Sequence, residues 1–242
     1  MNDIYPDATM RYGATDRQVA DVFEPDAPTD SLVLLLHGGW WRDSDRVRTW
    51  AAGRALAEAG HLTATVAYRT GAGQWAAALE DLGTAIEQIG LSGREWTVHN
   101  AAPRRTTLVG HSAGGQLALV AASRPVAPLT GVLALAPAAA LAEMSAQGIG
   151  EGAVEEFLGG TPGSAPAAYA TADPIGLVPG VPVRILHGAG DEVIPAQISR
   201  LYAAAHAGVA LEVLPDAEHA AWGDPSSAVW PRMLEAVAEL TA

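Results

Sequence analysis

The stretch Leu108-Val109-Gly110-His111-Ser112-Ala113-Gly114-Gly115 decides the fold expected for this chain. It reads as a short apolar strand, a Gly-x-Ser-x-Gly turn and the start of a helix that continues through residues 116–121. This order is typical of a turn that presents a nucleophilic serine at the end of a strand. Such a turn forces the serine into strained backbone angles, and the flanking glycines supply the space beside it. The motif alone is a weak signal in a chain rich in Gly and Ala, so its meaning depends on the rest of the sequence.

Apolar runs and amphipathic segments alternate on both sides of this turn. The runs predict buried strands at residues 31–36, 62–68, 131–136, 183–187 and 210–214, and a possible N-terminal hairpin of residues 9–12 and 18–23. Helices are expected at residues 44–59, 75–90 and 196–205, after the turn itself, and at the C-terminus to about residue 240. Residues 91–105 read as a polar connection. Residues 137–180 break the rhythm, show no strand, and could hold one short helix near residues 152–157.

Strands that alternate with helices at this spacing predict a three-layer α/β fold. We expect a mostly parallel sheet of about eight strands with helices on both faces. Residues 1–242 are expected to form a single domain, with 137–180 as a small cap or loop insertion, because long irregular connections in compact domains are usually functional. Ligands of such sheets bind beyond the carboxyl ends of the strands.

The composition excludes several classes of protein. The 242 residues are 49% hydrophobic and 17% charged, which allows a large core and argues against disorder. A net charge of −13 argues against nucleic acid or anionic membranes as partners. The absence of cysteine excludes disulfides, thiolate metal sites and a cysteine nucleophile. The first residues show no signal-peptide pattern, and no apolar run is long enough to span a membrane, so a cytoplasmic location is expected. The bias toward Ala, Gly and Arg suggests a bacterial genome rich in GC.

A serine nucleophile needs a histidine base that is oriented by a carboxylate. Asp191 follows the strand 183–187, and His219 follows the strand 210–214, so the chain order is Ser112, Asp191, His219. This is the order that α/β enzymes with such a turn use. Three residues in three turns after strands are an unlikely coincidence, and they are the expected catalytic triad.

Other acidic residues compete for the carboxylate role. Glu192 could replace Asp191, but it lies one position further into the turn and is expected to be solvated. Asp216 and Glu218 are too close in sequence to His219 to support its imidazole.

The remaining histidines are expected to be structural. His111 is expected to pack against a neighbouring strand, and His37 to brace the loop after the strand 31–36. No two histidines are spaced for a metal site on a helix, so neither a metal nor a cofactor is expected.

The negative charge that develops on a substrate carbonyl needs backbone N–H donors. One is expected from Ala113, which directly follows the serine. Gly38 and Gly39, in the loop after the strand 31–36, are expected to supply the others, with Gly39 preferred over Trp40.

The chain resembles the α/β-hydrolase superfamily over nearly its whole length. Within it, the motifs resemble the esterase and lipase group with an HGG oxyanion loop, and the tryptophans after that loop resemble the arylformamidases, also called kynurenine formamidases. The motifs that carry this resemblance are His37-Gly38-Gly39-Trp40-Trp41, Tyr68-Arg69, Gly110-His111-Ser112-Ala113-Gly114-Gly115, His187-Gly-x-x-Asp191-x-x-Ile194-Pro195, and the segment His219 to Pro225.

The resemblance implies an α/β-hydrolase fold and acyl transfer to water without a cofactor. The substrate is expected to be a small ester or amide, with N-formylkynurenine as one candidate. The residues expected to bind it are Trp40, Trp41, Arg69 and Trp222. A non-catalytic binding module and a small serine peptidase are the alternatives, and a monomer or homodimer is expected.

Overall fold

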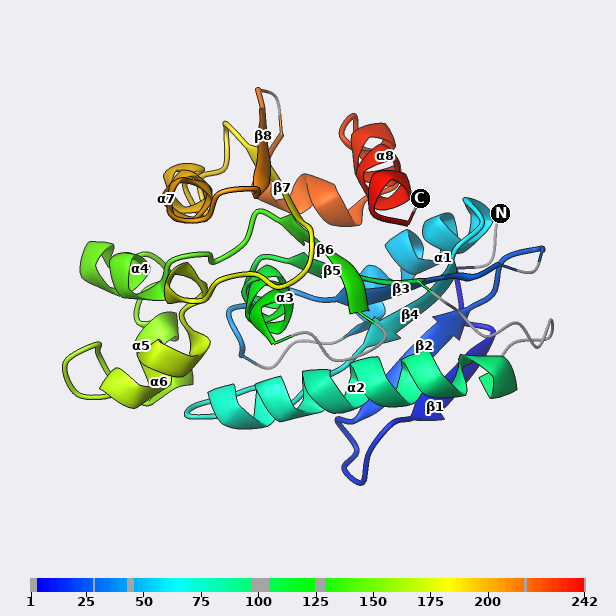
Figure 1. Cartoon of the computed structure of the whole chain (residues 1–242), viewed down its shortest axis with the longest axis horizontal. Helices are drawn as coiled ribbons and strands as arrows, with labels where there is room; N and C mark the ends of the chain where they lie inside the picture. The colour runs from blue at the N-terminus through cyan, green and yellow to red at the C-terminus, as the bar shows by residue number, and fades with distance from the viewer. Residues whose placement is uncertain are drawn as a thin grey trace.

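An eight-stranded sheet forms the centre of the molecule (Figure 1). The computed structural model describes residues 4–27, 29–42, 46–96, 105–124, 129–215 and 217–241, with the backbone alone for 91–96. The strands are β1 (Ala8–Arg11), β2 (Val19–Phe23), β3 (Ser31–Leu36), β4 (Leu62–Val66), β5 (Arg105–His111), β6 (Leu129–Leu135), β7 (Val183–Gly188) and β8 (Ala210–Leu214). Their order across the sheet is β1-β2-β4-β3-β5-β6-β7-β8.

The sheet is mostly parallel, as predicted. β1 pairs antiparallel with β2, which confirms the N-terminal hairpin, and β2 pairs antiparallel with β4. The other neighbours are all parallel. The carboxyl ends of β3, β5, β7 and β8 therefore meet at one edge of the sheet.

Helices cover both faces of the sheet. The α-helices are α1 (Trp50–Glu58), α2 (Trp75–Trp96), α3 (Ala113–Ser123), α4 (Leu141–Gln147), α5 (Ala153–Leu158), α6 (Pro166–Ala172), α7 (Gln197–Ala205) and α8 (Trp230–Thr241), and short 3-10 helices form η1 (Arg46–Thr49), η2 (Pro174–Gly176) and η3 (His219–Gly223). Figure 1 shows α1 and α8 on one face and α2 and α3 on the other. None of the helices in the described ranges combines the length and the apolar character that a membrane span needs.

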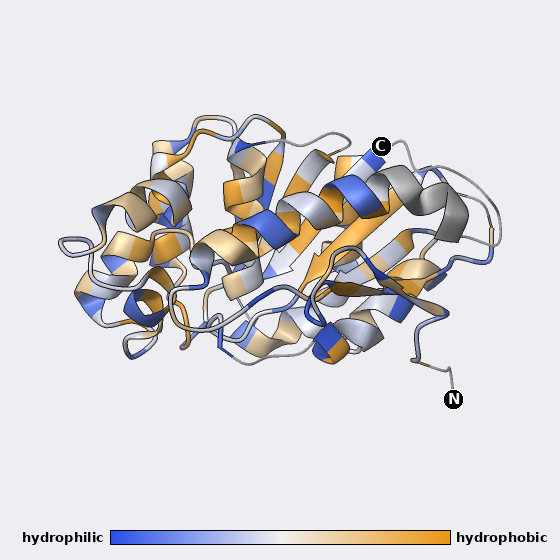
Figure 2. Ribbon diagram, turned by 90° about the horizontal axis from the view of Figure 1, so that it is seen from below, coloured by the Kyte–Doolittle hydropathy of each residue, from blue (hydrophilic) through white to orange (hydrophobic). Residues whose placement is uncertain are grey.

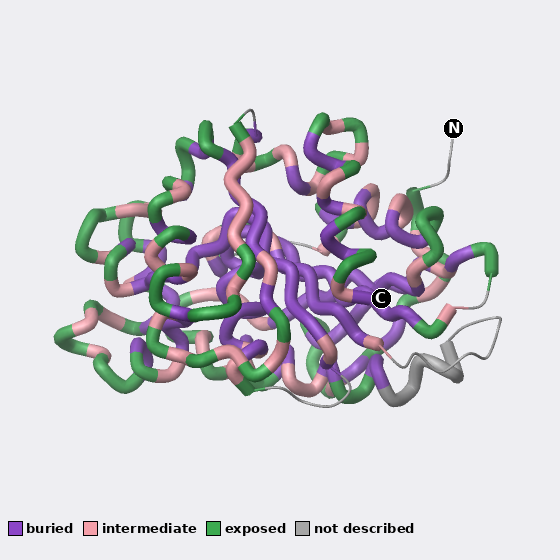
Figure 3. The backbone as a smooth tube through the Cα atoms, turned by 45° about the horizontal axis from the view of Figure 1, so that its top comes forward, coloured by how far each residue is buried: buried purple, intermediate pink, exposed green. Residues whose placement is uncertain are grey.

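The alternation of side chains along the strands creates two cores. On β3, Leu32, Leu34 and Leu36 pack into the core under α2 and α3. Val33 and Leu35 point the other way, into the core under α1 and α8. The central strands are hydrophobic in Figure 2 and buried in Figure 3, as expected for a parallel sheet covered on both faces.

Two predicted segments differ from the structure. Helix α2 extends to Trp96 instead of ending near residue 90, so part of the expected polar connection is helical, and residues 97–104 lie outside the described ranges. The predicted start of the first helix, Ser44, also lies outside them; η1 begins at Arg46 and α1 at Trp50.

The segment 137–180 holds more helix than predicted. It contains α4, α5, α6 and η2, which gather at one end of the molecule in Figure 1, while the sequence indicated only the helix near residues 152–157. Glycines with positive φ end α4 and α5, at Gly148 and Gly159, so each helix is too short for a clear period.

Candidate active site

The Gly-x-Ser-x-Gly motif forms the sharp turn between β5 and α3. Ser112 has φ 55° and ψ −117°, a conformation that costs a non-glycine residue about 1–3 kcal/mol. A Cβ on Gly110 would lie 2.2 Å from the carbonyl oxygen of Gly114, and one on Gly114 would lie 2.5 Å from that of His37. The prediction that these two glycines make room for the serine is confirmed. Helix α3 begins at Ala113, so its first N–H groups follow the serine directly.

Asp191 and His219 meet beyond the ends of β7 and β8. The Nδ1 of His219 donates a hydrogen bond of 2.7 Å to Oδ2 of Asp191. The other carboxylate oxygen, Oδ1, accepts the backbone N–H groups of Val193 at 2.9 Å and Ile194 at 2.8 Å. With Nδ1 committed to the carboxylate, Nε2 is the nitrogen of His219 that is left to accept a proton.

The hydrogen bonds on Asp191 keep its carboxylate charged. Burial by itself raises the pKa of Asp191, but hydrogen bonds from His187, His219 and the backbone of Ile194 together hold the pKa well below its usual range. The exposed neighbour Glu192 makes none of the contacts that the structure records for Asp191. The competing acid Asp216 lies outside the described residues.

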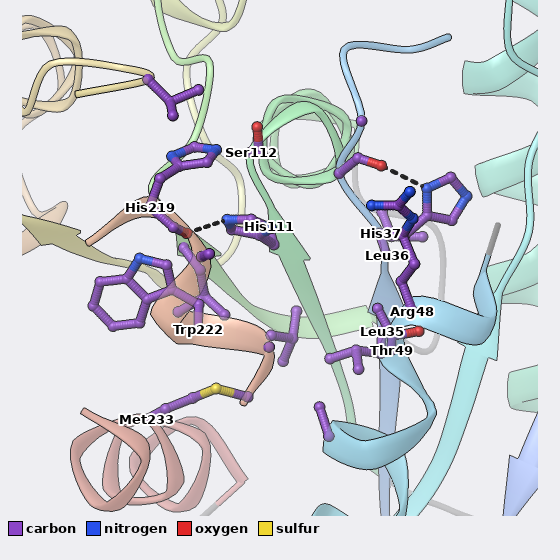
Figure 4. Close-up of a pocket in the computed structure, with 18 of the residues that line it drawn as sticks. Leu35, Leu36, His37, Arg48, Thr49, His111, Ser112, His219, Trp222 and Met233 are labelled. Carbon is purple, nitrogen blue, oxygen red and sulfur yellow. Dashed lines mark hydrogen bonds between the residues drawn. The ribbon is translucent and has the colours of Figure 1, made fainter. Parts of the chain in front are cut away.

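A cavity of about 320 Å³ joins Ser112 and His219. Figure 4 places both residues at one end of this pocket and Met233 at the other. Leu35, Val109 and Leu135 add apolar side chains of the sheet to a wall that also holds Arg48 and Thr49. Among the described residues, Ser112 and His219 are not joined by a hydrogen bond, and in unliganded enzymes this contact often tightens only when substrate binds.

In the loop His37-Gly38-Gly39-Trp40-Trp41 after β3, the residues from His37 to Trp40 form the side of the pocket next to Ser112. A Cβ on Gly38 would lie 2.9 Å from Cβ of Ser112, so only glycine allows the loop to approach the serine this closely. Gly39 has φ 122°, and Trp40 and Trp41 have φ 56° and 55°. Two consecutive tryptophans in the left-handed region are strained, so the surrounding contacts must hold the loop in place.

His37 braces this loop, as predicted. Its ring stacks on Tyr68 with 4.4 Å between centroids, and its Nδ1 lies 2.8 Å from the carbonyl oxygen of Gly38. The hydroxyl of Tyr68 donates to the carbonyl oxygen of His37 at 2.7 Å.

Trp41 does not line the pocket, contrary to prediction. It is 1% exposed, its Nε1–H donates to Oε1 of Gln116 at 2.9 Å, and its ring stacks on Phe157. Gln116 in turn donates to the carbonyl oxygen of Ala172, which ties the loop to α3 and α6. Trp41 is therefore an anchor for the loop, while Trp40 and Trp222 do line the pocket.

The prediction for Arg69 is also wrong. Its guanidinium pairs with Asp81 at 2.6 Å and with Glu80 at 2.7 Å, both on α2, and it does not reach the pocket. Asp81 is fully buried and needs this cation. Because Glu80 and Asp81 lie 11 and 12 residues further along the chain, on α2, no sequence motif links them to Arg69.

We expect the Arg69→Gln variant to be unstable but normal in substrate affinity. Loss of the guanidinium leaves the buried charge of Asp81 without its cation, which costs about 3 kcal/mol in the free energy of unfolding. Urea unfolding measures this loss, and the KM for an ester substrate stays within about twofold. A large rise in KM with unchanged stability would instead place Arg69 at the substrate.

Several pocket residues escaped the sequence prediction. Arg48 and Thr49 of η1, Ala52 of α1 and Met233 of α8 carry no motif. They reach the site only because α1 and α8 cover the face of the sheet on which the pocket lies.

His111 contacts the His219 segment rather than packing only against a strand. Its Nε2 lies 2.8 Å from the carbonyl oxygen of His219, so this nitrogen carries the hydrogen and donates it. The two imidazole rings are 4.8 Å apart. The pKa of His111 is lowered to about 4, mainly because the ring is buried and to a lesser extent because His219 lies beside it.

This lowered pKa predicts a pH-dependent stability. Between about pH 6.5 and 4, His111 binds a proton in the unfolded chain but not in the folded one, so the free energy of unfolding falls as the pH falls through this window, by roughly 1–3 kcal/mol. The His111→Gln variant keeps an N–H donor for the carbonyl oxygen of His219 but cannot titrate. Urea unfolding at pH 7, 5.5 and 4.5 should show a shallower decline for this variant; equal slopes would contradict the prediction.

Within the described ranges, no group of three or more His, Cys, Asp or Glu side chains is arranged to hold a metal ion.

The comparisons with known proteins agree with this fold. The model of the BD-FAE family matches residues 20–205. No curated protein matches the chain in sequence. Among solved structures, a truncated carbohydrate esterase from gut microbiota superposes with a TM-score of 0.81 at 16% identity, covering 99% of this chain and 98% of that one.

A thermophilic esterase from the planctomycete Thermogutta terrifontis is also similar. Its Est2 structure with bound propionate has a TM-score of 0.75 at 19% identity, covering 98% of this chain and 94% of that one. The structure of esterase 2 from this organism phosphonylated by sarin has a TM-score of 0.73 at 19% identity, with 96% and 92% covered. These similarities confirm the predicted α/β-hydrolase fold.

Proposed function

Because the chain belongs to the BD-FAE family, we propose that it is a serine hydrolase that cleaves small carboxylic esters through an acyl-enzyme. The observation that carries this proposal is the hydrogen bond between His219 and Asp191 at the edge of a pocket that Ser112 also lines. The similar solved structures are those of esterases, which supports the same reaction class.

Each residue of the site has a step in this mechanism. The Oγ of Ser112 attacks the ester carbonyl carbon while Nε2 of His219 takes its proton. Asp191 holds His219 in the required tautomer and stabilises the imidazolium. His219 then returns the proton to the leaving alkoxide, which departs as the alcohol. Water enters, gives a proton to Nε2 of His219 and attacks the acyl carbon; the bond to Oγ of Ser112 then breaks, His219 returns the proton to Oγ, and the acid is released.

The negative charge that develops on the carbonyl oxygen needs backbone N–H donors, on the side of Ser112 away from His219. Gly38 and Gly39 form the pocket wall next to Ser112, and the amide of Ala113 lies at the start of α3. We assign these three N–H groups to the oxyanion hole. The helix dipole of α3 adds to the stabilisation, because its positive end lies at the serine.

The pocket favours a short, uncharged acyl group. A volume of about 320 Å³ and walls of Leu35, Val109, Trp222 and Met233 suit an alkyl chain better than a polar one. An aromatic formamide, the substrate of a kynurenine formamidase, is the second candidate because Trp40 and Trp222 line the pocket. Two of the four residues that favoured it, Trp41 and Arg69, lie elsewhere, so the ester is the better proposal.

The experiment that tests the proposed function is a substrate panel. Nitrophenyl acetate, butyrate and laurate and a formanilide are assayed with the wild type and with Ser112→Ala. Each methylene buried in the pocket is worth about 0.8 kcal/mol, so kcat/KM should rise about two- to fourfold per methylene from acetate to butyrate and fall for laurate. Preference for the formanilide would move the assignment to the formamidase, and no Ser112-dependent turnover of any substrate would refute the hydrolase.

The non-catalytic alternatives have less support. A binding module needs no oriented imidazole, yet Asp191 and His219 are paired beside Ser112. A small serine peptidase would share the mechanism, and adding a short peptide anilide to the panel separates it from an esterase.

A further inference from the structure

We propose that His187 is a positioning residue for the Asp191–His219 pair, a role that rests on the proposed hydrolase function. His187 lies at the end of β7, four residues before Asp191, and its side chain is fully buried. It takes no part in the mechanism described above, yet it contacts the carboxylate on which that mechanism depends.

The hydrogen bonds of His187 determine its tautomer. Its Nε2 lies 2.8 Å from the carbonyl oxygen of Ile194, which can only accept, so Nε2 carries the hydrogen. Its Nδ1 lies 2.7 Å from the hydroxyl of Ser199, which therefore donates to it. Both nitrogens of the ring are therefore held by hydrogen bonds.

The same Nε2–H also faces the carboxylate of Asp191. Nε2 lies 3.3 Å from Oδ2, the oxygen that accepts the hydrogen bond from His219. The hydrogen is thus shared between a short contact to Ile194 and a longer, mainly electrostatic contact to Asp191. Ile194 closes the arrangement, because its own N–H donates to Oδ1 of the same carboxylate.

This arrangement fixes the position of the carboxylate and weakens its electrostatic attraction to the imidazolium form of His219. Donors hold both oxygens, so Asp191 cannot rotate away from Nδ1 of His219. Because Oδ2 serves two imidazoles, it stabilises the imidazolium form of His219 less than an unshared oxygen would. Besides Asp191, the titratable group packed against His219 is His111, whose ring is tilted by 47° to it with 4.8 Å between centroids; Arg48 lines the same pocket.

Removing the donor should therefore change both the rate and its pH dependence. In His187→Leu, kcat for a nitrophenyl ester should fall by about 10- to 100-fold because Asp191 loses a fixed position, while KM stays within about twofold. The acid limb of the kcat/KM profile should move to higher pH, because the full charge of Oδ2 then favours protonated His219.

Two further variants separate positioning from simple packing. His187→Gln places an N–H donor near the position of Nε2 and should recover most of kcat and the wild-type acid limb. Ser199→Ala removes the hydrogen bond on the far side of the ring but leaves the contact with Asp191, so its profile should match the wild type. If His187→Leu leaves kcat and the acid limb unchanged, or if glutamine restores neither, the proposal is overturned.

A measurement on the unmodified protein covers the case in which His187→Leu does not fold. A ¹⁵N-histidine NMR spectrum of the wild type should show His187 as the neutral tautomer with hydrogen on Nε2, and that signal should shift in Asp191→Asn. The opposite tautomer, or no shift, would overturn the role of His187. Because the spectrum needs no turnover, it separates failure of this proposal from failure of the hydrolase function.

Discussion

The Ser112→Ala variant is expected to lose at least about 10⁴-fold in kcat for the best ester of the panel while its fold stays intact. Ser112 lines the pocket, its hydroxyl is the nucleophile of the proposed reaction, and alanine leaves no oxygen in its place. Alanine removes a single oxygen from a side chain that is already small, so the strained turn at φ 55° is not disturbed further. Residual activity is expected from the oxyanion donors and the binding pocket alone.

A matched serine variant serves as the control for this prediction. Ser226 is exposed and contacts Asp224 in the turn before α8, away from the pocket lining. Ser226→Ala should retain the wild-type kcat, and thermal unfolding should show both variants folded. Similar ester turnover by Ser112→Ala and the wild type would exclude Ser112 as the nucleophile.

The second large effect is expected for Asp191→Asn, with a fall of about 10⁴-fold in kcat. The amide has nearly the shape of the carboxylate, but it can turn its NH₂ toward Nδ1 of His219. Nδ1 must then accept, which leaves the hydrogen on Nε2, and His219 can no longer take the proton of Ser112. The stabilising charge beside the imidazolium is lost as well.

The neighbouring acid gives a direct control for Asp191. Glu192→Gln removes one negative charge from the adjacent, exposed position and should leave kcat within about twofold, because surface charges contribute little at this range. Measuring kcat for both variants at pH 8 decides between the two acids. A large loss in Glu192→Gln with little loss in Asp191→Asn would reverse the assignment.

Much of the fold could be predicted because its signals are local. The apolar runs of β3, β5, β6 and β7 are short and bounded by turn residues, and the alternation with helices indicates a parallel sheet. Of the helices in residues 137–180, α5 was predicted, whereas α4 and α6 were missed because each is only seven residues long. Their positions depend on tertiary contacts such as the carboxylate of Asp173, which accepts the first N–H groups of α4.

The candidate site likewise contains residues that could be predicted from the sequence and residues that could not. Ser112, Asp191 and His219 could be predicted because each follows a strand, and parallel strands bring such positions to one edge. Trp41 and Arg69 were assigned to substrate because their real partners, Gln116 and Asp81, are separated from them by 75 and 12 residues and form no motif with them. The sequence gives no separate signal for His187, because this residue lies at the end of a predicted strand and inside a motif that also contains Asp191.

The proposed acyl-enzyme at Ser112 can be tested directly by covalent labelling. A fluorophosphonate probe reacts with an activated serine, and the phosphonylated form of the esterase from Thermogutta terrifontis supports this choice of probe. Peptide mapping by mass spectrometry should find the adduct on Ser112 in the wild type, greatly slowed labelling in Asp191→Asn, and none in Ser112→Ala. If the protein hydrolyses the ester but carries no adduct on Ser112, or carries the adduct on another residue, the account is contradicted.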